Sequence, residues 1–275
     1  MSPLFFFFGS PSVKRILAFN SLLVFLSLVL GACGGVSSAS RTLTVYAAAS
    51  LTDAFTEIGK AFEADQPGVT VVLNFGGSQN LRTQIEQGAP ADVFASANIK
   101  EMDTLVAQNF IAAEAPHVFL TNQLVVILPK NNPAGIDSLE DLGQPGLKLV
   151  LAAEEVPAGR YARQILENLN SMYGADYADR VLANVVSNED NIRQAVTKVQ
   201  LGEADASIVY VSDAVAAPEL GQIAIPADIN VVAEYPIASL IGSANPELAD
   251  AFIAYVLSPA GQATLEKWGF TPVSP

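Results

Sequence analysis

Residues 42–64 read TLTVYAAASLTDAFTEIGKAFEA, and this stretch decides the class of fold. Its first part, residues 42–48, is rich in apolar and β-branched side chains, which predicts a β-strand. From residue 51 to residue 64 apolar side chains recur at intervals of three and four, as in the buried stripe of an amphipathic helix (Leu51, Ala54, Phe55, Ile58 and Phe62). A strand that passes through one short turn into a helix is the repeating unit of α/β proteins.

The same unit is repeated further along the chain. Two more strands are predicted at 69–75 and 91–97, followed by helices at 80–87 and 99–108. This order favours a mainly parallel sheet with helices on both faces. Beyond it, the pattern predicts strands at 148–153, 181–186 and 206–211, and helices at 138–142, 158–169, 192–201, 245–257 and 259–268.

Two extended apolar stretches, 117–128 and 231–241, flank the middle of the chain. We interpret them as crossovers between two α/β lobes, each built on a mainly parallel sheet flanked by helices. The first lobe is predicted to comprise residues 42–122 and 231–275, and the second residues 123–230.

The N-terminal segment has the pattern of an export signal. Lys14 and Arg15 precede an apolar run at 16–30. This run is too short to cross a bilayer comfortably, but it has the length of a signal-peptide core.

The apolar run ends in Leu30-Gly31-Ala32-Cys33, which resembles the bacterial lipobox, in which the cysteine is lipidated and becomes the new N-terminus. Residues 1–33 are therefore predicted to be a lipoprotein signal peptide, and residues 34–41 a flexible Gly/Ser-rich tether. An uncleaved anchor helix and a free, buried cysteine are the alternatives.

The composition excludes several classes of function. Of the 275 residues 51% are apolar, which allows a substantial core, and 28 acidic residues against 14 basic ones give a formal charge of −14. Such a chain is a poor partner for nucleic acid and for an anionic membrane surface. With one cysteine, Cys33, and one histidine, His117, the sequence has no disulfide framework and no multi-cysteine or histidine-rich metal site. We expect no cofactor.

Four predicted strand-to-helix turns carry small or polar residues, at 47–53, 75–79, 155–161 and 188–192. The first N–H groups of a helix have no partner within it, and the helix dipole makes this end attractive to anions. In an open α/β sheet such turns lie together at the carboxyl ends of the strands. The turns therefore predict an anion site that contains neither lysine nor arginine.

Each turn also has a purely structural interpretation. Ser50 is followed three residues later by Asp53, close to a capping box, so the alternative is that it only caps its helix. Ser78 follows two turn glycines and has the same alternative. By default, a core, turn or strand-packing position is expected for Ala158, Ile192 and Tyr210.

Five short motifs occur in order along the chain: TVYAAASL at 44–51, GGSQ at 76–79, GAPADVF at 88–94, VPAGRYA at 156–162 and IVYVSDA at 208–214. Together they resemble the bacterial molybdate-binding protein family (ModA), and the resemblance extends from about Leu43 to Trp268. It implies a two-lobed periplasmic-binding-protein clamp, type II-like, with two crossover segments.

The resemblance also implies a ligand and the residues that hold it. Molybdate, and with it tungstate, would be bound through neutral donors: hydroxyl and N–H groups of Ser50 and Ser78 from one lobe, N–H groups of Ala158 and Ile192 from the other, and the phenol of Tyr210. No residue would bind a metal cation directly.

The family's role implies the partners. The protein would be a monomer that delivers the oxyanion to an ABC permease and its ATPase. It would stay at the outer face of the cytoplasmic membrane, attached only through the lipid on Cys33, and it would not be an enzyme.

Three alternatives remain at this stage. The same clamp could serve another oxyanion, such as sulfate or phosphate. A tethered hydrolase with Ser50 or Ser78 as nucleophile would need a base, but His117 is the sole imidazole and neither serine lies in a G-x-S-x-G turn. The third alternative is a structural surface lipoprotein without a small ligand.

Overall fold

The computed structural model describes residues 1–6 and 41–273. The chain divides into two units, Met1–Ala39 and Ser40–Pro275. Residues 1–6 are exposed and have no regular secondary structure. The apolar run, Cys33 and nearly all of the predicted tether lie outside the described residues. Within the part that is described, none of the helices has the length and apolar character needed to cross a membrane.

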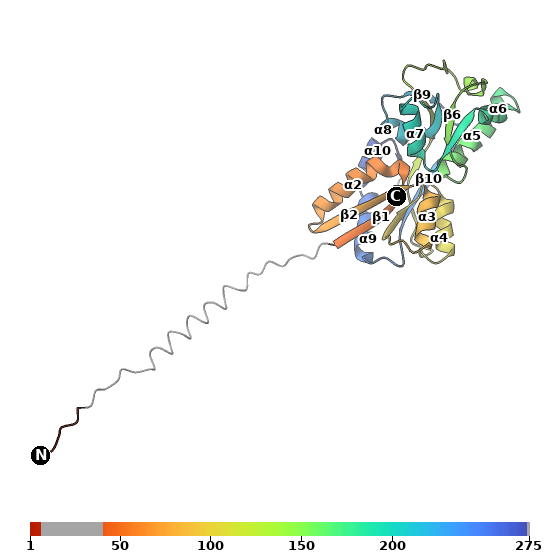
Figure 1. The fold of residues 1–275 in the computed structure, drawn as a ribbon. Coiled ribbons are helices and arrows are strands. Elements are labelled where there is room, and N and C mark those ends of the chain that lie inside the picture. Colours follow the sequence, from red (N-terminus) through yellow and green to blue (C-terminus); the bar gives the residue numbers. More distant parts are fainter. Residues whose placement is uncertain (7–40, 274–275) are drawn as a thin grey trace. The chain divides into compact units, whose positions relative to one another are not determined.

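The second unit alternates strands and helices (Figure 1). The strands are β1 (Arg41–Ala48), β2 (Val69–Gly76), β3 (Val93–Ala95), β4 (His117–Asn122), β5 (Leu124–Leu128), β6 (Leu149–Ala152), β7 (Val185–Glu189), β8 (Ser207–Tyr210), β9 (Gly221–Ala224), β10 (Ala233–Ser239) and β11 (Thr271–Pro272). The helices are α2 (Thr52–Asp65), α3 (Ser78–Glu86), α4 (Ile99–Ala107), α5 (Pro157–Tyr173), α6 (Tyr177–Ala183), α7 (Ile192–Gln200), α8 (Val211–Ala216), α9 (Pro246–Leu257) and α10 (Pro259–Lys267), with short 3-10 helices η1 (Ala49–Leu51) and η2 (Glu140–Gly143).

The beginning and the end of this unit build one six-stranded sheet, in the order β11-β4-β10-β3-β1-β2. Strand β1 pairs in parallel with β2 and β3, as the repeated strand–helix unit predicts. Strand β10 runs antiparallel to β3 and β4, and β11 antiparallel to β4. The prediction of a mainly parallel sheet is therefore wrong in this detail. The reason is that β4 leads the chain out of the sheet and β10 leads it back, so the two neighbours point in opposite directions.

The middle of the chain forms two smaller sheets. Strand β5 lies between β8 and β9 and is antiparallel to both, whereas β6 and β7 are parallel. A parallel bridge between Leu149 and Ala206 links the two sheets. Here too the sheet is mixed rather than mainly parallel, because β5 continues the outgoing crossover strand. The strand predicted at 181–186 begins too early, since residues 177–183 form α6.

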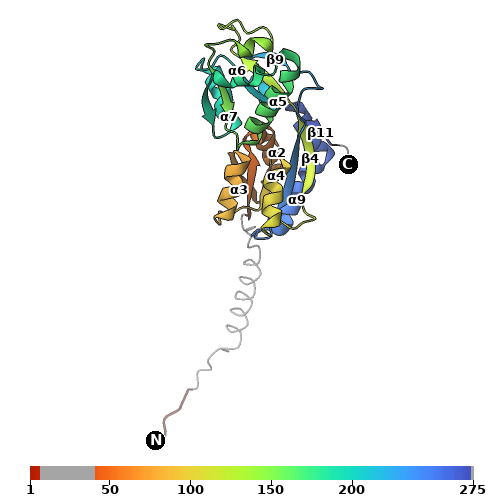
Figure 2. The ribbon, with the colours of Figure 1, turned by 90° about the vertical axis from the view of Figure 1, so that its right-hand side faces the viewer.

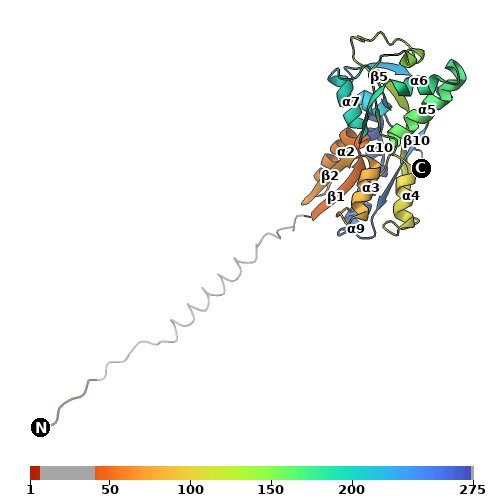
Figure 3. The ribbon, with the colours of Figure 1, turned by 45° about the vertical axis from the view of Figure 1, so that its right-hand side comes forward.

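Helices cover both faces of the six-stranded sheet. Successive side chains of β1 pack alternately against the helices of one face and of the other. Val45 lies in the core cluster that includes Phe55 of α2 and Phe252 of α9, while Tyr46 lies in the cluster formed with α3 and α4. Figures 1 and 3 show α3 and α4 grouped beside the sheet, away from α2. This alternation is the period of two expected of a β-strand.

The chain passes between the two groups of sheets in two places. Only Gln123 separates β4 from β5, and the return runs through residues 225–232. Asn230 fastens the two passages together, because its side-chain N–H donates to Leu124 O (2.8 Å) and its side-chain oxygen accepts from Leu124 N (3.1 Å). The lobe boundaries predicted after residue 122 and before residue 231 fall in these connections, and they stay a prediction.

In Figure 2, α5, α6 and α7 lie at one end of this unit and α3, α4 and α9 at the other. Every strand-to-helix turn predicted to bind an anion lies at the boundary between these two ends. We call the end built on the six-stranded sheet the first half, and the end built on β5–β9 the second half.

Candidate functional site

A small cavity, here called the central cavity, lies between the two halves. It has about 210 Å³ of atom-free space and is lined by Ala48, Ala49, Ser50, Gly76, Gly77, Ser78, Ala97, Val156, Pro157, Ala158, Asn191, Ile192 and Tyr210. The structure thus brings all the predicted binding residues together in one place. Among the residues that the structure describes, no charged side chain lines this cavity.

Neither cavity serine acts as a helix cap. Helix α2 begins after η1, with Leu51 at its N-cap, and Gly77 occupies the N-cap of α3; neither cap makes a side-chain hydrogen bond. Instead, Ser78 Oγ accepts a hydrogen bond from Ala97 N (3.0 Å). The capping alternative is therefore wrong, and the Ser78 O–H proton is free to point at a guest in the cavity.

The helix starts supply backbone donors. In α5, Pro157 is the first helical residue and has no N–H, so Ala158 provides the first one. In α7, the side chain of Asn191 accepts a hydrogen bond from Gln194 N (3.2 Å), which leaves the N–H of Ile192 for other partners. Both residues line the central cavity, from the second half of the unit.

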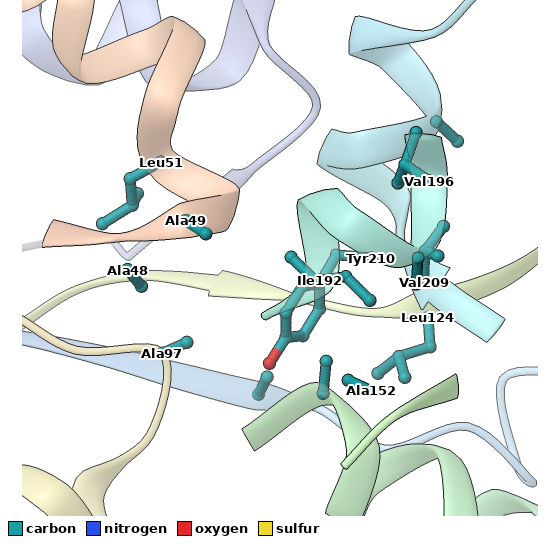
Figure 4. Close-up of a cluster of buried hydrophobic side chains, with 14 of the residues drawn as sticks. Ala48, Ala49, Leu51, Ala97, Leu124, Ala152, Ile192, Val196, Val209 and Tyr210 are labelled. Carbon is teal, nitrogen blue, oxygen red and sulfur yellow. The ribbon is translucent and has the colours of Figure 1, made fainter. Parts of the chain in front are cut away.

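Tyr210 brings a buried phenol to the same cavity. Its side chain is 1% exposed, and its hydroxyl has no hydrogen-bond partner within the described part of the chain. Figure 4 shows the ring with its hydroxyl directed away from Val209, on the side where Ala97 lies. Burial raises the pKa of Tyr210 well above the usual value for tyrosine, so the group keeps its proton and remains a donor.

Tyr235 is a buried neighbour of the site that the sequence analysis missed. Its hydroxyl lies 2.9 Å from Ser50 Oγ, and its ring packs edge-on against the Tyr210 ring at 5.7 Å between centroids. If Tyr235 donates to Ser50 Oγ, the Ser50 proton is directed to the cavity. Burial raises the pKa of Tyr235, which keeps it available as that donor. The two partners are 185 residues apart in the sequence, and no local pattern signals the pair.

The two halves contact each other directly beside the cavity. The side-chain N–H of Gln79, in α3, donates to Asp190 O in the turn before α7 (3.2 Å). Gly77 lies so close to the same carbonyl that a Cβ atom there would be 2.6 Å from Asp190 O. The cavity is therefore enclosed by contacts that separation of the halves would break.

Arg193 adds a charged contact between the halves. Its Nη2 lies 2.5 Å from Asp53 Oδ2 in α2, and its Nε lies 3.0 Å from Asp213 Oδ1 in α8. Asp213 is fully buried, and this burial raises its pKa to about 6 even though the nearby Arg193 acts to lower it. These side chains stand outside the central cavity, so they hold the halves together without adding charge to it.

The hydrolase alternative lacks a base at the site. His117 begins β4 and is exposed, and it borders a different cavity, together with Ser239 and Asp250. Since the sequence contains one histidine, neither Ser50 nor Ser78 has an imidazole partner. A serine without a general base is a weak nucleophile.

Comparison with known proteins agrees with this geometry. Residues 43–271 match the family described as bacterial extracellular solute-binding proteins. The molybdate-binding protein ModA of Mycobacterium tuberculosis is 39% identical over 268 residues, covering 93% of this chain and 98% of that protein. ModA of Escherichia coli is 36% identical over 252 residues, covering 89% and 95%.

A solved structure supports the fold. The periplasmic molybdate-binding protein of Azotobacter vinelandii superposes with a TM-score of 0.73 at 23% identity, covering 85% of this chain and 99% of that one. The predicted α/β clamp of two lobes is thereby confirmed. The matched family consists of solute-binding proteins and not of enzymes. The chain therefore belongs to the family of bacterial extracellular solute-binding proteins.

Proposed function

We propose that this protein captures molybdate, and with it tungstate, outside the cytoplasm and delivers the oxyanion to an ABC permease and its ATPase. The observation that carries the proposal is the central cavity, where Ser50, Ser78, Ala158, Ile192 and Tyr210 meet and where no described residue contributes a charged side chain. Each of these residues offers a hydrogen-bond donor. The relatives named molybdate-binding protein support the choice of ligand.

A lining made of donors suits a guest that only accepts hydrogen bonds. Molybdate is fully deprotonated near neutral pH, so each of its oxygens can face an N–H or O–H group. Bound in the cavity, it would also give the unpartnered Tyr210 hydroxyl an acceptor. Leaving such a buried group unpaired costs about 1–3 kcal/mol, which binding would recover.

The same lining discriminates against phosphate. Near neutral pH phosphate keeps a proton, and this proton needs an acceptor such as a carboxylate. No carboxylate of the described residues lines the central cavity. A buried, unpaired O–H is unfavourable, so we expect phosphate to be rejected by its protonation state. Sulfate carries no proton, so it must be rejected by size, because the metal–oxygen bonds of molybdate are longer.

Isothermal titration calorimetry with molybdate, tungstate, sulfate and phosphate tests the proposal. We expect molybdate and tungstate to bind and phosphate not to bind. Ser78→Ala should weaken molybdate binding by about 10- to 100-fold, because a hydrogen bond to a charged group contributes about 1.5–3 kcal/mol.

Ser171→Ala is the matched control, since Ser171 is exposed on α5 and lies outside the central cavity. The control should bind like the wild type. If no oxyanion binds to the wild type, the proposed function is wrong; if only sulfate binds, the ligand is wrong and the class of function stands.

We also propose that a lipid on Cys33 holds the protein at the outer face of the cytoplasmic membrane, as a monomer. Cys33 lies outside the described residues, so this proposal is based on Leu30-Gly31-Ala32-Cys33 in the sequence. Cys33→Ala should move the protein from the membrane fraction to the soluble fraction. Mass spectrometry that finds an unmodified Cys33 in the membrane-bound protein would contradict the anchor.

A further inference from the structure

A second cavity, here called the Arg160 cavity, adjoins the central one. It has about 440 Å³ of atom-free space, and the residues that matter for its chemistry are Asn98, Lys100, Arg160, Tyr161 and Glu234. Ala97 and Ala158 line the central cavity, and their close neighbours Asn98 and Arg160 line this one. Two segments, one from each half, thus contribute residues to both cavities.

Asn98, which lines the Arg160 cavity, has an unused hydrogen-bond donor. Its side chain is 3% exposed, and its side-chain oxygen accepts a hydrogen bond from Glu101 N (3.0 Å) as the N-cap of α4. This bond fixes the orientation of the amide, because the opposite orientation would place two N–H groups against each other. The amide nitrogen is thereby left over, and it is buried without a partner in the described residues.

Arg160 presents a second unused donor. Its Nη2 atom is buried and has no hydrogen-bond partner among the described residues, and no acidic side chain of these residues forms an ion pair with it. A guanidinium can donate but never accept. Asn98 and Arg160, which both line this cavity, therefore each have a buried donor that lacks an acceptor in the described residues.

The charge of the Arg160 cavity favours an anion. Lys100 and Arg160 contribute two positive charges, and Glu234, which is exposed and unpaired in the described structure, contributes one negative charge. The phenol of Tyr161 adds no charge, since burial raises its pKa above the ordinary value. This patch is thus positive on a chain whose formal charge is −14.

We propose that the Arg160 cavity is an outer station for the small oxyanion dianion that the central cavity binds. This inference rests on the proposed function and adds the route by which the ligand arrives. Lys100 and Arg160 attract the dianion, and Asn98 and Arg160 donate hydrogen bonds to it. When the halves separate, the ligand moves to the neutral donors of the central cavity.

The two cavities have different roles because their interactions with an anion act over different distances. Fixed neutral donors act at contact distance and give selectivity, but they attract a distant anion weakly. Full positive charges act over about 8–10 Å at physiological salt, so a cavity with a net positive charge speeds the approach of an anion. We therefore expect the station to control the association rate and not the residence time of the ligand.

Stopped-flow measurement of molybdate association tests this inference. Arg160→Gln should slow association by about 5-fold and flatten its dependence on ionic strength, with an unchanged dissociation rate. Lys148→Gln is the matched control: it removes one positive charge from an exposed residue that borders neither cavity, and its rate should stay within about 2-fold of the wild type.

A second variant tests the Arg160 cavity without changing the guanidinium of Arg160. Asn98→Asp retains the oxygen that caps α4 but replaces the donor with a negative charge, so it should slow association at least as much as Arg160→Gln. Thermal unfolding of each variant shows whether the fold is kept. Equal association rates for Arg160→Gln, Asn98→Asp and Lys148→Gln would overturn the station while leaving the proposed function intact. A wild type that binds no oxyanion would overturn both.

Discussion

Gly77→Ala should weaken molybdate binding by about 100-fold while leaving the stability of the protein close to that of the wild type. Gly77 is the N-cap of α3 and has φ −62° and ψ 134°, a conformation that alanine adopts without strain. The added Cβ would lie 2.6 Å from Asp190 O and from the side chain of Gln79. Gln79 can rotate away, but Asp190 O is a backbone atom of the opposite half.

The clash in Gly77→Ala is therefore relieved by holding the two halves apart. Overpacking a close contact typically costs about 1–3 kcal/mol. In this variant that free energy opposes the closing of the two halves around the ligand. Calorimetry measures the loss of affinity, and small-angle X-ray scattering should show a larger radius of gyration with ligand than for the ligand-bound wild type.

Gly242→Ala is the matched control for this prediction, because no atom of the described residues lies within 4 Å of a Cβ placed there. It should bind like the wild type. If Gly77→Ala also bound like the wild type, the close approach of Gly77 to Asp190 would not be needed for closure around the ligand.

Gly159→Ala should lower the free energy of unfolding by about 3 kcal/mol or more. A Cβ at this position would lie 2.0 Å from Ala153 O and 2.3 Å from Ala152 O, at the end of β6. Both atoms are backbone, so either α5 or the strand must shift. Replacing glycine by alanine within a helix gains at most about 1 kcal/mol from helix propensity, which is too small to compensate.

Equilibrium unfolding in urea measures this loss. Gly59→Ala is the matched control, because Gly59 is also helical, in α2, and the nearest atoms to its Cβ are side-chain carbons of Leu73 and Val71 at 3.5 Å or more. That variant should be as stable as the wild type or slightly more stable. Wild-type stability in Gly159→Ala would show that α5 can move away from β6 at little cost.

The position of the site could be predicted from the sequence because it depends on local patterns. Each binding segment is a turn from a strand to a helix, and the carboxyl ends of neighbouring strands meet at one edge. Ser50 and Ser78 follow β1 and β2, which pair with each other, so their proximity follows from the order of elements. The resemblance to the molybdate-binding family then selected the residues of the second half. Their role as ligands stays a prediction.

Two features could not be predicted from the sequence, because they depend on contacts between segments that are far apart in the chain. The hydrogen bond between the hydroxyls of Tyr235 and Ser50 joins β10 to η1, and nothing in either segment indicates it. The β-branched residues around Val181 suggested a strand, but α6 forms there instead. Tertiary contacts favour that helix: Tyr177 is fully buried, and the side chain of Asn170 accepts a hydrogen bond from Ala178 N. Such packing commonly overrides weak local propensities.

The amide of Asn230 has a mechanical consequence. By bonding both the N–H and the C=O of Leu124, it ties the beginning of β5 to the returning connection at residues 225–232. We expect this pair of hydrogen bonds to make the two connections bend together and to restrict sliding between them. We therefore expect closing to bring the two halves to the same relative position each time, which would give the permease one shape to recognise.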